Sequence, residues 1–222
     1  MNIDCVKNRI SAFSHCYLRE CCNYSVKQPF IYTMKKFLTF MLLVFISCIL
    51  AGIYGILHDQ LTYTISPEYY TKFKFYQFEL ADMGQEAILP NPRIAVCYVG
   101  FMATWWMGLF IGILLGLTGI IQPDSKEMFL ITLDSFLIAI SIAFFIGVAG
   151  LLYGYFELSL NPPQYFSSWF IPEDLVNYRN FIAVGSMHNF SYLGGIFGLI
   201  GGMLYIFYKK YSVLKRLNFR SL

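Results

Sequence analysis

Four long apolar stretches dominate the pattern of hydrophobic and polar positions along the chain. They cover residues 37–57, 94–121, 129–156 and 182–208, and most charged side chains lie between them or at the two ends. Each stretch is long enough to cross a bilayer, which takes about 20 apolar residues in an α-helix. Helix is the expected form, because lipid offers the backbone no hydrogen-bond partner. The pattern therefore predicts an all-α fold, a polytopic membrane four-helix bundle.

The second and fourth stretches resemble each other. Residues 106–116 (WMGLFIGILLG) align with residues 192–202 (YLGGIFGLIGG) without a gap, with glycine on glycine at three positions. Each half of the chain would then be a helix, an outer loop and a helix, in the same orientation in both halves. The match favours a tandem duplication, although glycine and aromatic residues are common in membrane helices and composition alone can produce such a similarity.

This repeat predicts the organisation of the chain. Residues 1–33 are expected to form a disordered cytoplasmic tail. Residues 34–121 are the first two-span repeat and residues 122–208 are the second, and residues 209–222 form a basic cytoplasmic tail.

Glycines recur every four residues in the second and fourth spans, and they predict close helix packing. Small residues at this spacing line one helix face and let two backbones approach. We therefore expect these two spans to form the central pair of the bundle, or else the interface of a homo-oligomer. The six glycines are Gly108, Gly112, Gly116, Gly194, Gly198 and Gly202.

Composition and charge agree with a membrane protein and orient it. The chain is 57% hydrophobic and 13% charged, whereas soluble domains have about 25% charged residues. Twelve of the 16 Lys and Arg residues lie in the two tails and in the loop after the second span. The positive-inside rule then places both termini in the cytoplasm. The basic residues form no single groove, so the expected partner is the lipid bilayer and no nucleic acid is expected.

The first outer loop, residues 58–93, contains a helix-start signal. Ser66 precedes Pro67, which suits the first turn of a helix. Tyr69 and Phe73 then fall on one face, which predicts a short amphipathic helix on the outer membrane surface. A similar aromatic segment follows Asn161 in the second half.

The segment from Tyr54 to Gln60, continued by Ser66 to Tyr70, resembles one found in four-helix bacterial membrane proteins without an assigned function. The match covers about a tenth of the chain. It implies a bacterial inner-membrane protein and implies no activity.

His188 is the most informative polar residue, because it lies inside the fourth span and shares a helix face with Ser191. A buried ionisable side chain in a membrane is a functional candidate. His58, Asp59 and Glu157 come at the outer ends of other spans, so the four side chains are expected to converge. Two imidazoles and two carboxylates suit Zn, Fe or Mn, and the two histidines would alternatively ligate a haem.

Three observations keep other interpretations open. No H-x-x-E-H or E-x-x-H motif occurs, which favours the interpretation of the outer cluster as a set of structural interhelical hydrogen bonds. Asp134, near the cytoplasmic end of the third span, is a candidate for an ion or proton path to His188, or for a side chain that reaches the interface. His15, with the nearby cysteines of the leading tail, matches no standard zinc pattern.

The motifs that are absent narrow the function further. The sequence has no P-loop, no dinucleotide fingerprint, no C-x-x-C and no G-x-S-x-G, which argues against nucleotide hydrolysis, thioredoxin-like redox chemistry and α/β-hydrolase catalysis. A non-enzymatic role, as a small transport or channel component or as a membrane scaffold, is the first hypothesis. A metal- or haem-binding redox protein is the second. Whether the chain is an enzyme stays open.

Overall fold

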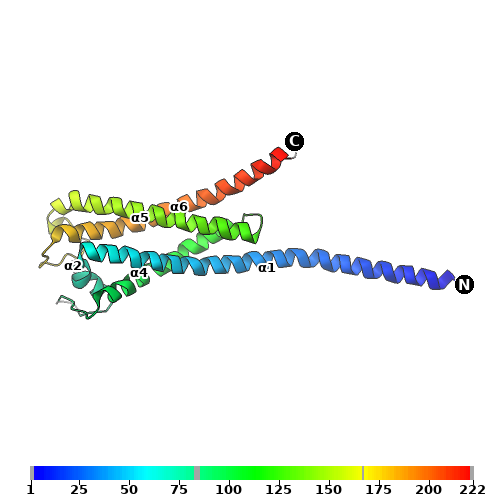
Figure 1. Cartoon of the computed structure of the whole chain (residues 1–222), viewed down its shortest axis with the longest axis horizontal. Coiled ribbons are helices and arrows are strands. Elements are labelled where there is room, and N and C mark those ends of the chain that lie inside the picture. The colour runs from blue at the N-terminus through cyan, green and yellow to red at the C-terminus, as the bar shows by residue number, and fades with distance from the viewer. Residues whose placement is uncertain (1–2, 83–85, 167, 221–222) are drawn as a thin grey trace.

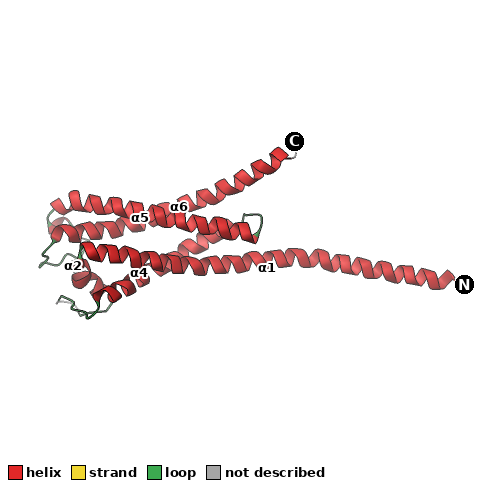
Figure 2. Cartoon of the chain, in the orientation of Figure 1, coloured by secondary structure: helices red, strands yellow, loops and turns green. Residues whose placement is uncertain are grey.

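Four long helices form an antiparallel bundle in the computed structural model, which describes residues 3–82, 86–166 and 168–220. Side chains are described for residues 31–82, 86–166 and 168–212. The long helices are α1 (Ile3–Ile65), α4 (Pro92–Gly119), α5 (Ser125–Phe156) and α6 (Tyr178–Arg220). Figure 1 shows both termini leaving the bundle at one end, opposite to the segments around α2, and the end with α2 is called the outer end below. A short loop joins α4 to α5, longer connections join α1 to α4 and α5 to α6, and the described part of the chain holds no strand (Figure 2).

All four helices contain a segment long and apolar enough to span a membrane, at Ile31–Ile65, Pro92–Gly119, Ser125–Leu160 and Tyr178–Ser212. Large apolar side chains remain exposed along these segments, such as Leu57 at 66% and Phe145 at 69%. Water would disfavour so large an exposed apolar surface, whereas lipid does not. The predicted all-α, four-helix membrane fold is confirmed.

The first span is longer than its hydrophobic pattern predicts. The apolar run ends at Leu57, but α1 continues to Ile65. The intervening residues include neither Gly nor Pro, so nothing in the backbone breaks the helix there. Pro67 then ends it, because the residue before a proline avoids the helical conformation. This extension carries His58 and Asp59 inside the helix rather than beyond its end.

At its other end, α1 begins at Ile3, whereas the sequence analysis expects a disordered tail over residues 1–33. The side chains of residues 1–30 lie outside the described part of the chain, and so do the candidate ligands His15, Cys16, Cys21 and Cys22. The domain boundaries stay a prediction. Cys48 and Cys97 are both free.

Helix α4 packs along α1 through its glycines. A Cβ atom added at Gly108 would meet the carbonyl oxygen of Ser47, and one added at Gly112 would meet the hydroxyl of the same residue. Ser47 also donates a hydrogen bond of 2.8 Å to the carbonyl oxygen of Gly108. Glycine at both positions lets the two backbones approach closely enough for this contact.

Helix α6 packs along α5 in the same way. A Cβ atom at Gly194 would lie 2.8 Å from the Cα atom of Ala143, and one at Gly198 would lie 2.5 Å from the carbonyl oxygen of Ala139. The pairs are therefore α1 with α4 and α5 with α6, and α4 has few contacts with α6. The expectation that the second and fourth spans form the central pair is wrong, because each glycine face is covered by the preceding helix of its own half.

A bent helical segment closes the outer end of the bundle. It consists of α2 (Pro67–Tyr69), the π-helix η1 (Tyr70–Lys74) and α3 (Phe75–Gln77). It packs on the bundle, with Tyr70 and Phe75 fully buried. Lys72 and Lys74 are buried as well, so the segment is not a simple amphipathic helix with its charges in water. The second outer connection has only the short 3₁₀-helices η2 (Leu158–Leu160) and η3 (Pro163–Tyr165).

Candidate functional site: a buried His–Asp–His cluster

Three ionisable side chains meet inside the outer half of the bundle. His58 and Asp59 come from α1 and His188 from α6, and their exposed fractions are 6%, 3% and 7%. One ligand atom from each residue lies within 4.8 Å of the other two. His58 is seven residues from the outer end of α1, so the cluster lies about 10 Å inside that end.

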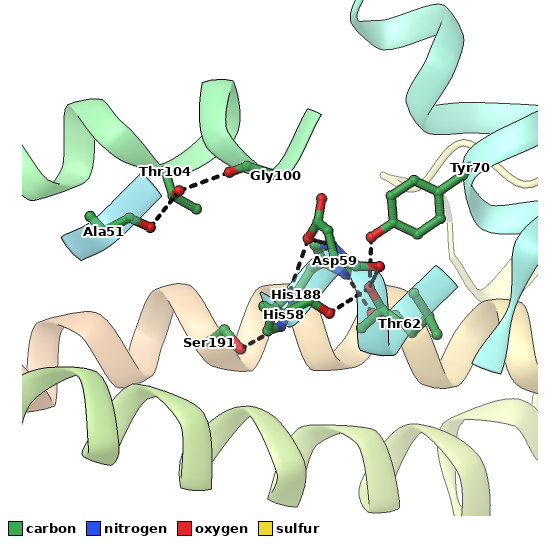
Figure 3. Close-up of polar contacts among 10 residues, drawn as sticks. Ala51, His58, Asp59, Thr62, Tyr70, Gly100, Thr104, His188 and Ser191 are labelled. Carbon is green, nitrogen blue, oxygen red and sulfur yellow. Dashed lines mark hydrogen bonds and ion pairs between the residues drawn. The ribbon is translucent and has the colours of Figure 1, made fainter. Parts of the chain in front are cut away.

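The carboxylate oxygen Oδ1 of Asp59 is the centre of this cluster (Figure 3). It lies 3.1 Å from Nδ1 of His58 and 3.3 Å from Nε2 of His188. The two imidazole rings meet edge to face, with centroids 4.8 Å apart. One carboxylate therefore joins two histidines that belong to different halves of the chain.

The outer partners of the histidines determine which nitrogens carry hydrogen. Nδ1 of His188 lies 2.9 Å from the carbonyl oxygen of Val184, which only accepts hydrogen bonds, so Nδ1 carries the hydrogen. In a neutral His188, Nε2 then carries a lone pair and accepts hydrogen bonds. It faces a carboxylate, which is also an acceptor. Two facing acceptors repel each other, so either a proton on one of the two residues or a metal ion is needed between them.

The geometry around Nε2 of His188 helps to decide between a proton and a metal ion. The 3.3 Å contact with Asp59 is short enough for an ion pair, but it lacks the alignment of an N–H···O hydrogen bond, and Nε2 has no hydrogen-bond partner among the described residues. The second carboxylate oxygen, Oδ2 of Asp59, and the hydroxyl of Tyr54 are likewise buried without a partner in the described part of the chain. Unsatisfied buried polar atoms are costly, so each of them requires a partner other than a described residue, such as a water molecule, a ligand or an ion.

His58 is held from its other side by Ser191. Nε2 of His58 lies 3.1 Å from the hydroxyl oxygen of Ser191 on α6. With Nδ1–H donating to Asp59, this Nε2 accepts the hydrogen of the serine hydroxyl. Ser191 lies three residues after His188, so a single face of α6 supplies both side chains.

A cavity of about 100 Å³ lies directly beneath the cluster, and all four long helices line it. Its outer end is polar and includes Tyr54, His58, Asp59, His188 and Ser191. The rest of its wall is mainly apolar, with Leu50, Met107, Ile111, Phe136 and Ile140. The three ionisable side chains therefore face a partly open, mainly apolar space within the membrane-spanning part of the bundle.

The outer segment covers the cluster from the opposite side. The ring of Tyr69 stacks on His188 with centroids 4.9 Å apart. The hydroxyl of Tyr70 is hydrogen-bonded to that of Thr62 at 2.6 Å, one turn after His58 (Figure 3). These contacts separate the cluster from the outer aqueous side.

This cover is anchored to the second outer loop by Glu68. Its two carboxylate oxygens accept hydrogen bonds from the backbone N–H groups of Val176 and Asn177, at 2.9 and 2.8 Å. Lys72 lies 3.1 Å from Glu68 and 3.2 Å from Asp174. Partial burial acts to raise the pKa of Glu68, but these hydrogen bonds and the lysine outweigh it and hold the pKa below its ordinary value.

Two of the predicted site residues stand apart from this cluster. Glu157 follows α5 and is exposed, and it is not a member of the group of three ligands. Asp134 is exposed and accepts a hydrogen bond of 3.1 Å from the hydroxyl of Tyr205. It does not line the cavity, so a path from Asp134 to His188 stays a prediction that no contact supports.

Sequence reasoning did not single out Tyr54 and Tyr69 as parts of the site. The position of Tyr54, four residues before His58, was a usable signal, because residues four apart share a helix face. Tyr69 gave no such signal, since its contact with His188 depends on how the outer segment folds back over the bundle.

No protein-family model, no curated protein and no solved structure matches this chain. The chemistry of the chain's own residues is therefore the basis for a functional proposal.

Proposed function

We propose that this chain is a multi-pass membrane protein that binds one divalent transition-metal ion through His58, Asp59 and His188. The observation that carries the proposal is the contact between two acceptors, Nε2 of His188 and Oδ1 of Asp59, at 3.3 Å in a buried site. A metal ion accepts both lone pairs and neutralises the buried carboxylate, whose unpaired charge would otherwise be very costly in a membrane.

The spacing of the ligand atoms supports this proposal. In a tetrahedral site with metal–ligand bonds of about 2.0–2.1 Å, neighbouring ligand atoms lie about 3.3 Å apart. The two distances from Asp59, 3.1 and 3.3 Å, are close to this value. The ligand nitrogens of His58 and His188 lie within 4.8 Å of each other, so a small side-chain movement would bring all three atoms onto one ion. Two imidazoles and one carboxylate suit Zn²⁺ and also Fe²⁺. Three protein ligands would leave one position open for a further ligand, and all three side chains line the cavity.

The outer hydrogen bonds of the two histidines also support metal binding. Metal-ligating histidines usually donate their other ring N–H to a carbonyl or carboxylate, which orients the ring. His188 does so toward Val184 at 2.9 Å. His58 would ligate through Nδ1 while its Nε2–H donates to Ser191, at 3.1 Å.

A haem has less support. Two histidines on opposite faces of a haem iron have ring centroids about 6 Å apart, since each bond to the metal is about 2 Å long. The rings of His58 and His188 are 4.8 Å apart and edge to face. The cavity of about 100 Å³ is also below the roughly 300–1,000 Å³ of typical ligand pockets.

A transport, channel or scaffold role stays a prediction without a specific contact in its favour. On α1 the cavity lining runs from Ser47 to Asp59, which is about 18 Å of helix, whereas the hydrocarbon core is about 30 Å thick. This cavity is therefore shorter than a continuous path across the membrane.

The proposal is tested by metal analysis of the full chain purified in detergent. We expect about one Zn²⁺ or Fe²⁺ per chain, and loss of this metal in His188→Ala and in His58→Ala. His15→Ala is the matched control, because His15 is the only other histidine of the chain, and this variant should keep its metal.

Two results would contradict the proposal. If the wild-type chain binds no metal after incubation with Zn²⁺, Fe²⁺ or Mn²⁺, the positive charge is a proton on His188 and the cluster is a structural ion pair. If His15→Ala loses the metal while His188→Ala keeps it, the metal belongs to the leading segment instead.

A further inference from the structure

The cavity beneath the cluster is kept open by one glycine. A Cβ atom added at Gly195 would meet no atom of the described residues within 4 Å, whereas one added at its neighbour Gly194 would collide with Ala143. Gly195 lines the cavity. Its missing side chain therefore provides space in the cavity rather than close contact between helices.

The cavity communicates with the lipid rather than with water. Tyr192 lines it and is 41% exposed on the membrane-spanning part of α6. The opposite, outer side is covered by Tyr69 and Tyr70, which are buried. A molecule that reaches this cavity therefore comes from the bilayer.

The polar end of the cavity offers both a hydrogen-bond donor and an acceptor that have no hydrogen-bond partner among the described residues. The donor is the hydroxyl of Tyr54 and the acceptor is Oδ2 of Asp59. An alcohol matches both, because its oxygen accepts one hydrogen bond and its O–H donates another. A hydrocarbon satisfies neither, and the carboxylate of a fatty acid has no O–H to donate to Oδ2 of Asp59.

The volume of the cavity limits how much of a bound molecule it can enclose. A cavity of about 100 Å³ is smaller than the roughly 150 Å³ that holds a benzene ring. It accommodates the first few methylene groups of a linear chain, while the remainder of the chain extends into the lipid. The apolar wall, with Leu50, Ile111 and Phe136, suits such methylene groups.

We infer that the cavity binds a linear lipid-soluble alcohol, with its hydroxyl at the open position of the metal and its first methylene groups in the space left by Gly195. The inference rests on the proposed metal site for the partner of the hydroxyl oxygen. Tyr54 donates to this oxygen, and Oδ2 of Asp59 accepts its hydrogen. The site then recognises an alcohol by three contacts and its chain by apolar burial.

The test uses photolabelling of the metal-loaded full chain in detergent. The probe is a long-chain primary alcohol with a diazirine on an early methylene group, and mass spectrometry locates the adducts. We expect adducts on cavity residues such as Leu50 and Ile111, displaced by excess 1-octanol but not by octane or octanoate. Gly195→Leu should lower the labelling roughly tenfold, because its side chain fills the cavity. Gly201→Leu is the matched control, since its added atoms would first meet only the flexible end of Ile142.

The outcomes separate this inference from the proposed function. Gly195→Leu should keep its metal, which is measured in the same samples. Labelling that is equal in wild type and Gly195→Leu would overturn the inference, and so would displacement by octane as strong as by 1-octanol. Displacement mainly by octanoate would overturn the choice of an alcohol. Tyr54→Phe should reduce the advantage of 1-octanol over octane, and an unchanged advantage would contradict the assigned contact. Absence of metal in the wild type would instead contradict the proposed function.

Discussion

Nε2 of His188 and Oδ1 of Asp59 lie 3.3 Å apart, and they join the last long helix of the bundle to the first. Both atoms are acceptors when His188 is neutral, because the hydrogen of this ring lies on Nδ1 and points to Val184. The contact is therefore favourable when a proton or a metal ion lies between the two atoms. In either case the approach of α1 to α6 depends on this third partner.

Substitution of Asp59 separates the roles of its charge and its shape. We expect Asp59→Asn to lose the metal but to fold, because the amide has the size of the carboxylate and donates to an imidazole nitrogen. Asp59→Leu should be less stable by about 3–5 kcal/mol, since it leaves buried polar partners unpaired. Metal content and thermal unfolding in detergent measure the two effects. Equal metal content in Asp59→Asn and wild type would contradict the assignment of Asp59 as a ligand.

Ser191 orients His58, so its removal should weaken metal binding without abolishing it. Loss of such an outer hydrogen bond typically lowers metal affinity by roughly 10- to 100-fold. We expect this for Ser191→Ala, measured by competition with a chelator. Ser141→Ala is the control, because this serine is exposed on α5 and bonds to the carbonyl oxygen of Leu137. A similar loss in both variants would show that the effect is not local.

The two kinds of glycine on α6 should respond differently to alanine. A Cβ atom at Gly198 would lie 2.5 Å from the carbonyl oxygen of Ala139, whereas one at Gly195 would meet nothing within 4 Å of the described atoms. We expect Gly198→Ala to destabilise the bundle by about 1–3 kcal/mol. Gly195→Ala should be neutral or slightly stabilising, because alanine favours helix over glycine. Unfolding in detergent measures both, and equal stabilities would contradict the close α5–α6 contact.

The anchor at Glu68 predicts a pH dependence of stability. The pKa of Glu68 is lower in the folded chain than its ordinary value of 4.5. Folding therefore favours the charged form, so its contribution is present above pH 4.5 and is lost as the pH falls through the lowered pKa. We expect Glu68→Gln to be less stable than wild type at pH 7, by about 1–2 kcal/mol.

The difference between wild type and Glu68→Gln should shrink as the pH falls below 4.5, and thermal unfolding from pH 3 to pH 7 measures it. Glu173→Gln, at an exposed carboxylate of the second outer loop, is the matched control. A difference that is constant over this range would indicate that the charge of Glu68 does not contribute.

The orientation in the membrane is tested by labelling single cysteines in a cysteine-free chain. Ile88 and Val176 are 93% and 91% exposed in the two outer connections, and Pro123 is exposed in the loop between α4 and α5. We expect a membrane-impermeant thiol reagent to label Ile88→Cys and Val176→Cys in intact cells. Pro123→Cys should react only after lysis, and the opposite pattern would place both termini outside.

The four helices of this fold follow from the sequence. The length of each apolar stretch requires a span, and lipid requires that the span be helical. The regular glycines of α4 and α6 also predicted close packing, and Gly108 and Gly198 do lie against backbone atoms of a neighbouring helix. The prediction of which helix is that neighbour was wrong, because a glycine face is complementary to many surfaces and the spacing of the glycines does not specify the partner.

Only part of the candidate site could be predicted from the sequence. His58, Asp59 and His188 were expected to converge with Glu157, and the first three meet while Glu157 is exposed. The apolar run ends at Leu57, which placed His58 at a boundary with water. Its burial is possible only because the outer segment folds over it and brings Tyr69 onto His188, a contact between residues far apart in the chain.

The sequence predicted the spans but not their contacts, because helix formation and helix packing depend on different properties of the chain. A membrane span is a local property, since hydropathy and backbone hydrogen bonds are decided within one segment. These spans are apolar on almost all sides, so their pattern does not tell which face turns inward. Tertiary packing decided the rotation of α1 against α6, and with it the approach of Asp59 to His188 and the space beside Gly195.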